Sequence, residues 1–71
     1  MKLVDMYDFI FDEEQGQCIV HQKLDDLNIL IIQYDMEGNV TRLDISQGAI
    51  DVTTLRFLLT KFLGLYVKRY N

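Results

Sequence analysis

Apolar and polar residues alternate along two stretches of the chain, and a short polar turn interrupts each stretch. The first covers residues 7–23 with a turn at 12–16, and the second covers residues 28–46 with a turn at 35–39. In both, an aromatic residue and an aspartate precede the turn and a glycine lies near its end, as in a type I turn closed by a left-handed glycine. The pattern predicts two β-hairpins, joined by an acidic turn at 24–27 into a four-stranded meander.

The segment at residues 3–11 fits two structures. Residues 7–11 alternate as the first strand of a hairpin does, and the turn that follows favours this interpretation. Apolar residues between Leu3 and Phe11 also form a helical stripe, with three aspartates on the opposite side. The sequence therefore predicts a strand here and leaves a helix open.

The last third of the chain predicts one amphipathic helix over residues 51–69. Asp51 suits the N-cap position, apolar residues recur at helical spacing, and two basic residues lie at the negative end of the helix dipole. Gly64 interrupts the helix at a cost of about 1 kcal/mol relative to alanine. Residues 65–70 therefore have an alternative structure, a fifth strand that follows a shorter helix.

The length of the chain allows a single domain. Its 71 residues are about half the usual length of a domain. We therefore expect one α+β domain over residues 1–71, a four-stranded antiparallel meander followed by one C-terminal amphipathic helix. A chain of this size buries only about 60% of the surface that its unfolded form exposes. Because 49% of its residues are hydrophobic, more apolar surface is present than one small core can hide.

The third predicted strand carries apolar residues on both faces. Ile29 and Ile31 fall on one face. Leu30, Ile32 and Tyr34 fall on the other. Because one helix covers only one face of a sheet, we expect the protein to be a homodimer that buries the remaining apolar surface.

The predicted helix offers a second candidate interface. Phe57 lies in the middle of its polar face, where we expect it to have no place in the core of the domain. Thr60 and Gly64 lie beside it and are small enough for another backbone to approach. The candidate residues for a dimer or partner interface are Ile31, Phe57, Thr60, Lys61 and Gly64.

Charge divides the chain into an acidic body and a basic tail. Residues 1–50 carry three Lys and Arg side chains against ten Asp and Glu, a net charge of −7. Residues 51–71 carry four against one, a net charge of +3. An acidic body does not favour binding to nucleic acid, because Lys and Arg supply most of the affinity for phosphates. It favours a protein partner with a basic surface.

Acidic residues gather in the first and third predicted turns, which a meander places at the same end of the sheet. They are Asp12, Glu13, Glu14, Asp35 and Glu37. They form either a docking surface for a basic partner or a solvated rim. The helix runs back about 27 Å at 1.5 Å per residue, so Lys68 and Arg69 should lie close to these acids.

The sequence contains no signature of an enzyme, a cofactor or a metal site. The single Cys18 and the single His21 lie three residues apart, which places them on opposite sides of a strand. The turn at 35–39 has its glycine at the fourth position, whereas an EF-hand loop needs it at the sixth. The longest apolar stretch covers only residues 29–32, so we expect no membrane association. Because a single cysteine cannot form an internal disulfide, we expect a reducing, cytoplasmic location.

In layout, four antiparallel strands followed by one helix resemble the Whirly and PUR type of single-stranded nucleic-acid-binding module. The stretch Arg42-Leu43-Asp44-Ile45-Ser46, leading into an aromatic-bearing helix, is similar to the end of such a unit. In size and charge the chain equally resembles the small acidic inhibitor proteins of phages, including anti-CRISPR proteins and other DNA mimics. This second resemblance implies inhibition of a host enzyme.

We expect a non-enzymatic interaction protein, an inhibitor or regulator whose acidic end docks on a basic surface of another protein. The alternative is a single-stranded nucleic-acid-binding module of the ββββα type. The position of the Lys and Arg side chains on the sheet distinguishes between these two functions. Lys23 and Arg42 on an open sheet face with Tyr7 and Tyr34 would favour nucleic acid.

Overall fold

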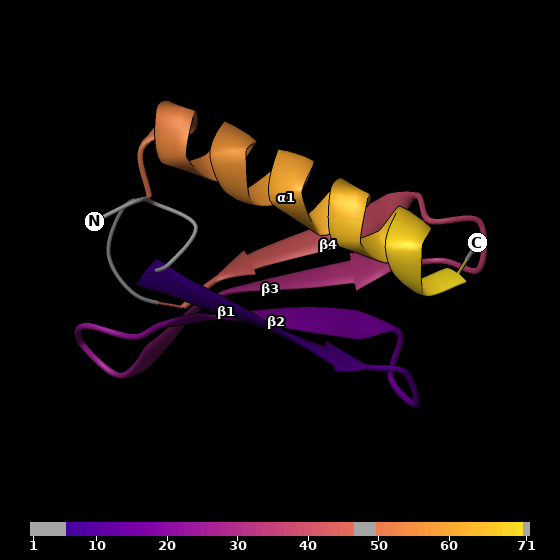
Figure 1. Cartoon of the computed structure of the whole chain (residues 1–71), viewed down its shortest axis with the longest axis horizontal. Coiled ribbons are helices and arrows are strands. Elements are labelled where there is room, and N and C mark those ends of the chain that lie inside the picture. The colour runs from indigo at the N-terminus through magenta and orange to yellow at the C-terminus, as the bar shows by residue number, and fades with distance from the viewer. Residues whose placement is uncertain (1–5, 47–49, 71) are drawn as a thin grey trace.

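The computed structural model describes residues 6–46 and 50–70, and within them four strands are followed by one helix (Figure 1). The elements are β1 (Tyr7–Asp12), β2 (Gln17–Gln22), β3 (Leu27–Tyr34), β4 (Val40–Ile45) and α1 (Val52–Tyr70). The strands form one antiparallel sheet in the order β1-β2-β3-β4. This confirms the predicted meander and C-terminal helix.

The structure also decides between the alternatives that the sequence left open. The strand interpretation holds for residues 7–12, while residues 3–5 lie outside the described residues. Residues 65–70 continue α1, so a fifth strand there is wrong. Gly64 lies inside the helix because Phe62 and Tyr66 on either side of it pack in or against the core. A Cβ at its position would meet no atom within 4 Å.

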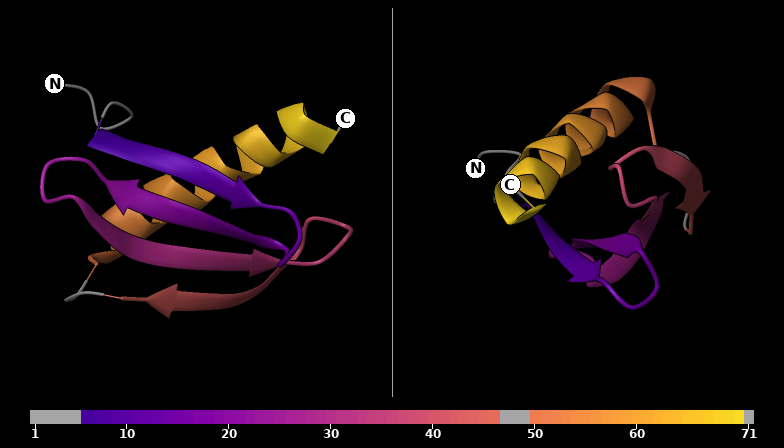
Figure 2. Two further views of the ribbon diagram at one scale, coloured as in Figure 1. Left: turned by 90° about the horizontal axis from the view of Figure 1, so that it is seen from below. Right: turned by 90° about the vertical axis from the view of Figure 1, so that its right-hand side faces the viewer.

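The helix α1 crosses one face of the sheet diagonally (Figures 1 and 2). The core lies between the two layers and contains eight buried apolar residues of the described chain: Tyr7, Cys18, Val20, Ile29, Leu30, Ile32, Leu58 and Phe62. Phe62 has no exposed surface, and its ring stacks on that of Phe11 at a centroid distance of 5.9 Å. Tight packing of this kind fixes the position of the helix on the sheet.

Asp51 caps the start of α1, as its position in the sequence predicts. One carboxylate oxygen accepts a hydrogen bond from the Thr54 backbone at 2.7 Å, and the other accepts one from the Thr54 hydroxyl at 3.0 Å. The backbone bond comes first among the causes that lower the pKa of Asp51. The cap satisfies amides that have no partner within the helix.

No helix in residues 6–46 and 50–70 covers the opposite face of the sheet. Ile10, Ile19 and Ile31 are cross-strand neighbours on that face, and Ile10 is 50% exposed. Ile29 departs from the alternation that placed it beside Ile31. A register shift between β2 and β3 leaves Ile29 without a partner in β2, and its side chain is buried in the core cluster.

Candidate functional site

The two acidic turns lie side by side at one end of the sheet, next to the C-terminal end of α1 (Figure 2, left). The amide of Tyr34, at the end of β3, donates a hydrogen bond to the carbonyl of Gly16 at 3.0 Å and links the two turns. The five predicted acidic residues lie in these turns or, for Asp12, at the strand end that leads into the first turn. We call this region the acidic end: Asp12, Glu13, Glu14, Asp35 and Glu37. The meander therefore brings them together as expected.

Two of these acids are structural parts of their turns. Asp35 accepts hydrogen bonds from the amides of Glu37 and Asn39, both at 2.9 Å, and from the Asn39 side chain at 3.2 Å. The Asn39 amide is the main cause that lowers the pKa of Asp35. Asp12 accepts one long bond, 3.4 Å, from the Gln15 amide. These carboxylates hold backbone groups and are less available to a partner.

A third acid is paired within the chain. The Arg69 side chain donates to the Glu13 carboxylate at 3.0 Å, as the predicted path of the helix requires. Its guanidinium also lies 4.9 Å from the centroid of the Phe11 ring. The side chains of Glu14 and Glu37 are exposed and, within the described residues, make no hydrogen bond or ion pair. They are the two acids of the acidic end whose carboxylates the described part of the fold does not engage.

A cavity of about 440 Å³ opens between the two turns and the end of α1. Its lining combines three tyrosines and a methionine with two of the acids: Glu13, Gly16, Tyr34, Asp35, Met36, Tyr66 and Tyr70. The rings of Tyr66 and Tyr70 have centroids 4.5 Å apart, and the hydroxyls of Tyr34 and Tyr70 lie 3.3 Å apart. We call this cavity the tyrosine cavity. The sequence pattern did not predict it, although Tyr66 and Tyr70 have the one-turn spacing that places both on one helix face.

Gly38 shapes the wall of the tyrosine cavity. Its backbone has a φ of +86°, and a Cβ at this position would lie only 2.6 Å from the Tyr66 ring. The Tyr66 hydroxyl donates to the carbonyl of Met36 at 3.2 Å. A glycine is therefore needed both for the turn and for the close approach of the helix.

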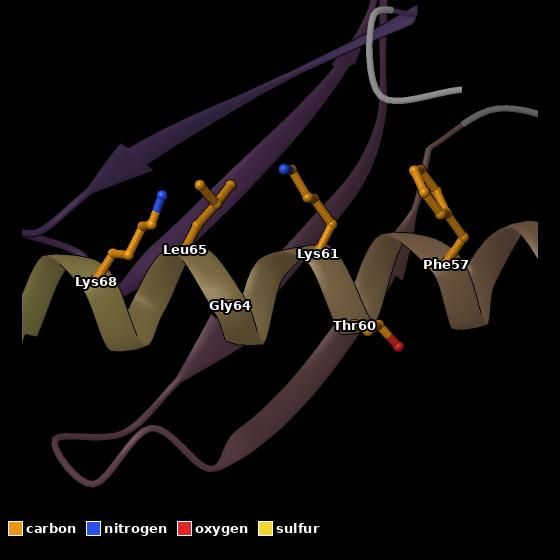
Figure 3. A pocket seen from close by; sticks show the side chains of 6 residues that line it. All are labelled: Phe57, Thr60, Lys61, Gly64, Leu65 and Lys68. Atoms are coloured by element: carbon orange, nitrogen blue, oxygen red, sulfur yellow. The ribbon is translucent and has the colours of Figure 1, made fainter. Parts of the chain in front are cut away.

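The predicted helix interface residues line a second cavity of about 300 Å³ on the side of α1. Four of its side chains point to the same side of the helix (Figure 3): Phe57, Lys61, Leu65 and Lys68. Thr60 points away from them, and Gly64 leaves the backbone open between. We call this cavity the helix groove.

The expectation that Phe57 has no place in the core is wrong. Its side chain is partly buried and packs against the core cluster. The reason is that a long aromatic side chain on the flank of a helix reaches down to the sheet beneath it. Ile31 lies on the open face of the sheet, away from the helix groove. The predicted interface residues therefore belong to two separate surfaces.

The arrangement that would favour nucleic acid is not present in residues 6–46 and 50–70. Tyr7 is buried in the core, and the ring of Tyr34 packs on Phe62 beneath the helix. Lys23 lies 3.5 Å from Asp8, and Arg42 lies 3.1 Å from Asp44. The cations therefore do not share an open face with these aromatic rings.

Cys18 and His21 lie in different environments. Burial raises the pKa of the Cys18 thiol to about 12, which keeps it protonated and a poor nucleophile. His21 is at the surface, where its Nδ1 lies 2.8 Å from Asn28 Oδ1 and its Nε2 lies 2.9 Å from Asp26 Oδ1. Among the side chains that the structure describes, no group of three His, Cys, Asp or Glu is placed to hold a metal ion.

His21 should make the stability of the fold depend on pH. Both ring nitrogens face oxygen acceptors, which favours the doubly protonated ring, and the bond to Asn28 is the main cause that raises its pKa above the ordinary 6.5. Protonated His21 therefore stabilises the folded state. Its contribution to the free energy of unfolding is complete below pH 6.5 and is lost as the pH rises through the folded-state pKa. Urea midpoints measured on both sides of that pKa should therefore be higher on the acidic side. In the His21→Gln variant this difference should shrink, and an equal difference in both proteins would contradict the assignment.

The comparisons with known proteins add no relative. No protein-family model matches the chain, and neither a curated protein nor a solved structure matches it. The resemblances in layout, size and charge therefore stay predictions. Within the described residues, α1 is too short or too polar to cross a membrane, and no other helix is present.

Proposed function

We propose that the protein is a non-enzymatic interaction module that docks its acidic end on a basic surface of another protein. One observation carries this proposal. The acids Glu14 and Glu37, whose side chains bond to no other described residue, lie at the same end of the molecule as the tyrosine cavity. Carboxylates attract a basic surface over a distance of about 10 Å at moderate salt. An aromatic cavity between them provides apolar contact once the surfaces meet.

The chemistry of the tyrosine cavity suits a guanidinium or an ammonium group. Such groups stack on aromatic faces and bind carboxylates at the same time. The chain's own Arg69 does this beside the cavity, where it lies over the Phe11 ring and donates to Glu13. Met36, which is 99% exposed at the rim, offers an adaptable apolar contact. An arginine or lysine of the partner is therefore the side chain that we assign to this cavity.

Neutralising the two available acids should weaken binding to a basic probe. The probe is a fluorescently labelled peptide of alternating arginine and glycine, followed by anisotropy at about 50 mM salt, where screening is weak. The double variant Glu14→Gln, Glu37→Gln should bind it roughly fivefold more weakly, because each exposed ion pair contributes up to about 1 kcal/mol. Folding should be unchanged, since neither side chain forms a hydrogen bond or ion pair with another described residue.

A matched variant removes two charges from the opposite end of the sheet. Asp8→Asn with Asp25→Asn changes the net charge equally and should weaken binding less than about twofold. Equal losses in the two double variants would mean that binding follows net charge, and that the acidic end is a solvated rim. Tighter binding of a labelled single-stranded DNA oligonucleotide than of the peptide would support the nucleic-acid alternative instead.

A further inference from the structure

The strand β4 has a free edge and an exposed apolar side. It is the outermost strand of the sheet (Figure 2, left), and no described segment pairs with its outer edge. Leu43 is paired with the fully buried Ile32, and Ile45 with the fully buried Leu30, so both side chains lie on the face that carries the helix. They are nevertheless 37% and 46% exposed. The helix therefore does not reach over β4.

The neighbouring flank of α1 is apolar as well. Leu63, Val67 and Tyr70 share one side of the helix by their spacing of four and three residues. The Tyr70 hydroxyl lies 3.3 Å from that of Tyr34 in β3, the strand next to β4, so this flank borders the β3 side of the sheet. Leu63 is 48% exposed and Val67 is 52% exposed. Strand and helix flank together leave an apolar surface beside an unpaired strand edge, which is an arrangement that other strands can join.

The backbone of β4 is oriented for pairing at this edge. The Ser46 amide donates to the Ile29 carbonyl in β3 at 3.1 Å. Because alternate residues of an antiparallel strand direct their backbone groups to opposite neighbours, Asp44 also bonds toward β3, while Leu43 and Ile45 direct theirs outward. Leu43 and Ile45, two positions apart on the same face, thus carry backbone donors and acceptors that pair with no described segment.

The charges of β4 are complementary to a second copy of the same strand. Arg42 and Asp44 flank Leu43 on the face opposite the helix and form an ion pair of 3.1 Å within the strand. If two copies pair antiparallel with Leu43 opposite Leu43, each Arg42 lies opposite the Asp44 of the other copy. This register produces an alternating group of four charges. On the helix side it places Leu43 opposite Leu43 and Ile45 opposite Thr41 of the other copy.

Three other self-pairings bring like charges together. A register centred on Asp44 or Arg42 sets like charges against each other. At the other edge of the sheet, a pairing of two β1 strands about Ile10 would place Asp8 opposite the Asp12 of the second copy. Of these self-pairings, the β4 register about Leu43 is the one that brings unlike charges together.

We propose that the protein forms a two-fold symmetric dimer in which β4 pairs antiparallel with β4 of a second copy, centred on Leu43. The two sheets become one continuous sheet of eight strands. The interface is isologous, since each copy contributes the same residues. It differs from both dimer surfaces that the sequence predicts, the open sheet face at Ile31 and the helix groove at Phe57, and it leaves the acidic end free.

A charge-swap experiment tests the register. In Arg42→Asp the paired strands carry only acids at these four positions, and in Asp44→Arg they carry only bases. Each variant alone should dimerise at least about tenfold more weakly, because favourable cross-strand pairs become repulsive. An equimolar mixture should recover the dimer, since each acid of one variant then lies opposite a base of the other. Lys61→Asp, the same charge reversal in the helix groove, should leave dimerisation unchanged.

Analytical ultracentrifugation of the full chain gives the result. The wild-type protein should sediment with twice the monomer mass of 8.4 kDa. A wild-type monomer, single variants that dimerise like the wild type, or a mixture that fails to recover would each overturn the proposal. Loss of the dimer in Lys61→Asp alone would overturn it too, and would place the interface in the helix groove. Hydrogen exchange of the wild type requires no variant: the Leu43 and Ile45 amides should be protected increasingly with concentration, and fast exchange at every concentration would also overturn the proposal.

Discussion

Replacing Phe62 with alanine is expected to remove most of the stability of the fold. The Phe62 side chain is fully buried, and its ring packs against those of Phe11, Tyr34 and Tyr66 at centroid distances of 5.9, 5.4 and 6.1 Å. Truncation of a buried phenylalanine typically costs about 3–5 kcal/mol, from lost burial and from the cavity that remains. Small domains have total stabilities near the lower end of roughly 5–15 kcal/mol. Urea unfolding followed by circular dichroism measures the loss.

The same change at Phe57 provides the matched control. Phe57 lies in the same helix but is only partly buried, at the edge of the core. Phe57→Ala should therefore cost less, roughly 1–2 kcal/mol. An equal or larger loss at Phe57 would mean that the helix packs on the sheet through the flank that carries Phe57, rather than through Phe62.

Replacing Gly38 with alanine is expected to cost roughly 2–4 kcal/mol. A left-handed backbone costs a non-glycine residue about 1–2 kcal/mol, and overpacking adds a similar amount. Both penalties apply here, because φ is +86° and the added Cβ would lie 2.6 Å from the Tyr66 ring. The ring must move away from the turn, so we expect the tyrosine cavity to change shape as well. Thermal unfolding measures the first effect, and the NMR shifts of the Tyr66 ring report the second.

Gly64→Ala is the matched substitution with the opposite expected sign. Gly64 lies inside α1 with no atom within 4 Å of an added Cβ, so alanine should stabilise the helix by about 0.5–1 kcal/mol. Stabilisation at position 38 would show that Tyr66 does not pack against the turn. Destabilisation at position 64 would indicate that another chain approaches the helix there, as the sequence predicts for the helix groove.

The local features of the fold were predictable because they depend on short stretches of sequence. The turn glycines Gly16 and Gly38 have the positive φ that the turn pattern requires, at +60° and +86°. Asp51 caps the helix through the next turn of backbone. In each case, residues within five positions of one another determine the local structure, so the short sequence pattern is enough to predict the turn or the cap.

The features that were missed depend on how distant segments meet. The tyrosine cavity forms because Tyr66 and Tyr70 reach a turn and a strand that lie 30 and 36 positions earlier in the chain. The burial of Phe57 depends on how closely α1 lies on the sheet. The order of residues around a helix does not give this distance. Leu43 and Ile45 lie on the face that carries the helix and are still exposed. Their exposure likewise depends on the diagonal path of α1 across the sheet (Figure 2).

The acidic end illustrates both cases. The sequence predicted correctly that its five acids lie together, because strand order alone brings the two turns to one end. It could not distinguish their roles, because those depend on hydrogen bonds in the folded turns. Asp35 binds backbone amides and Glu13 binds Arg69, whereas Glu14 and Glu37 face solvent. Of the five, these last two are the acids whose side chains bond to no other residue that the structure describes.

The most direct test of the docking proposal is to map where a basic ligand binds. The ¹⁵N-labelled protein is titrated with the arginine-glycine peptide, and amide shifts are followed by NMR. We predict changes concentrated at the acidic end, at Glu14, Gly16, Tyr34 and Glu37 and at the C-terminal turn of α1. Changes concentrated instead at the β2–β3 turn, or spread evenly over all acidic residues, would contradict the proposed docking surface.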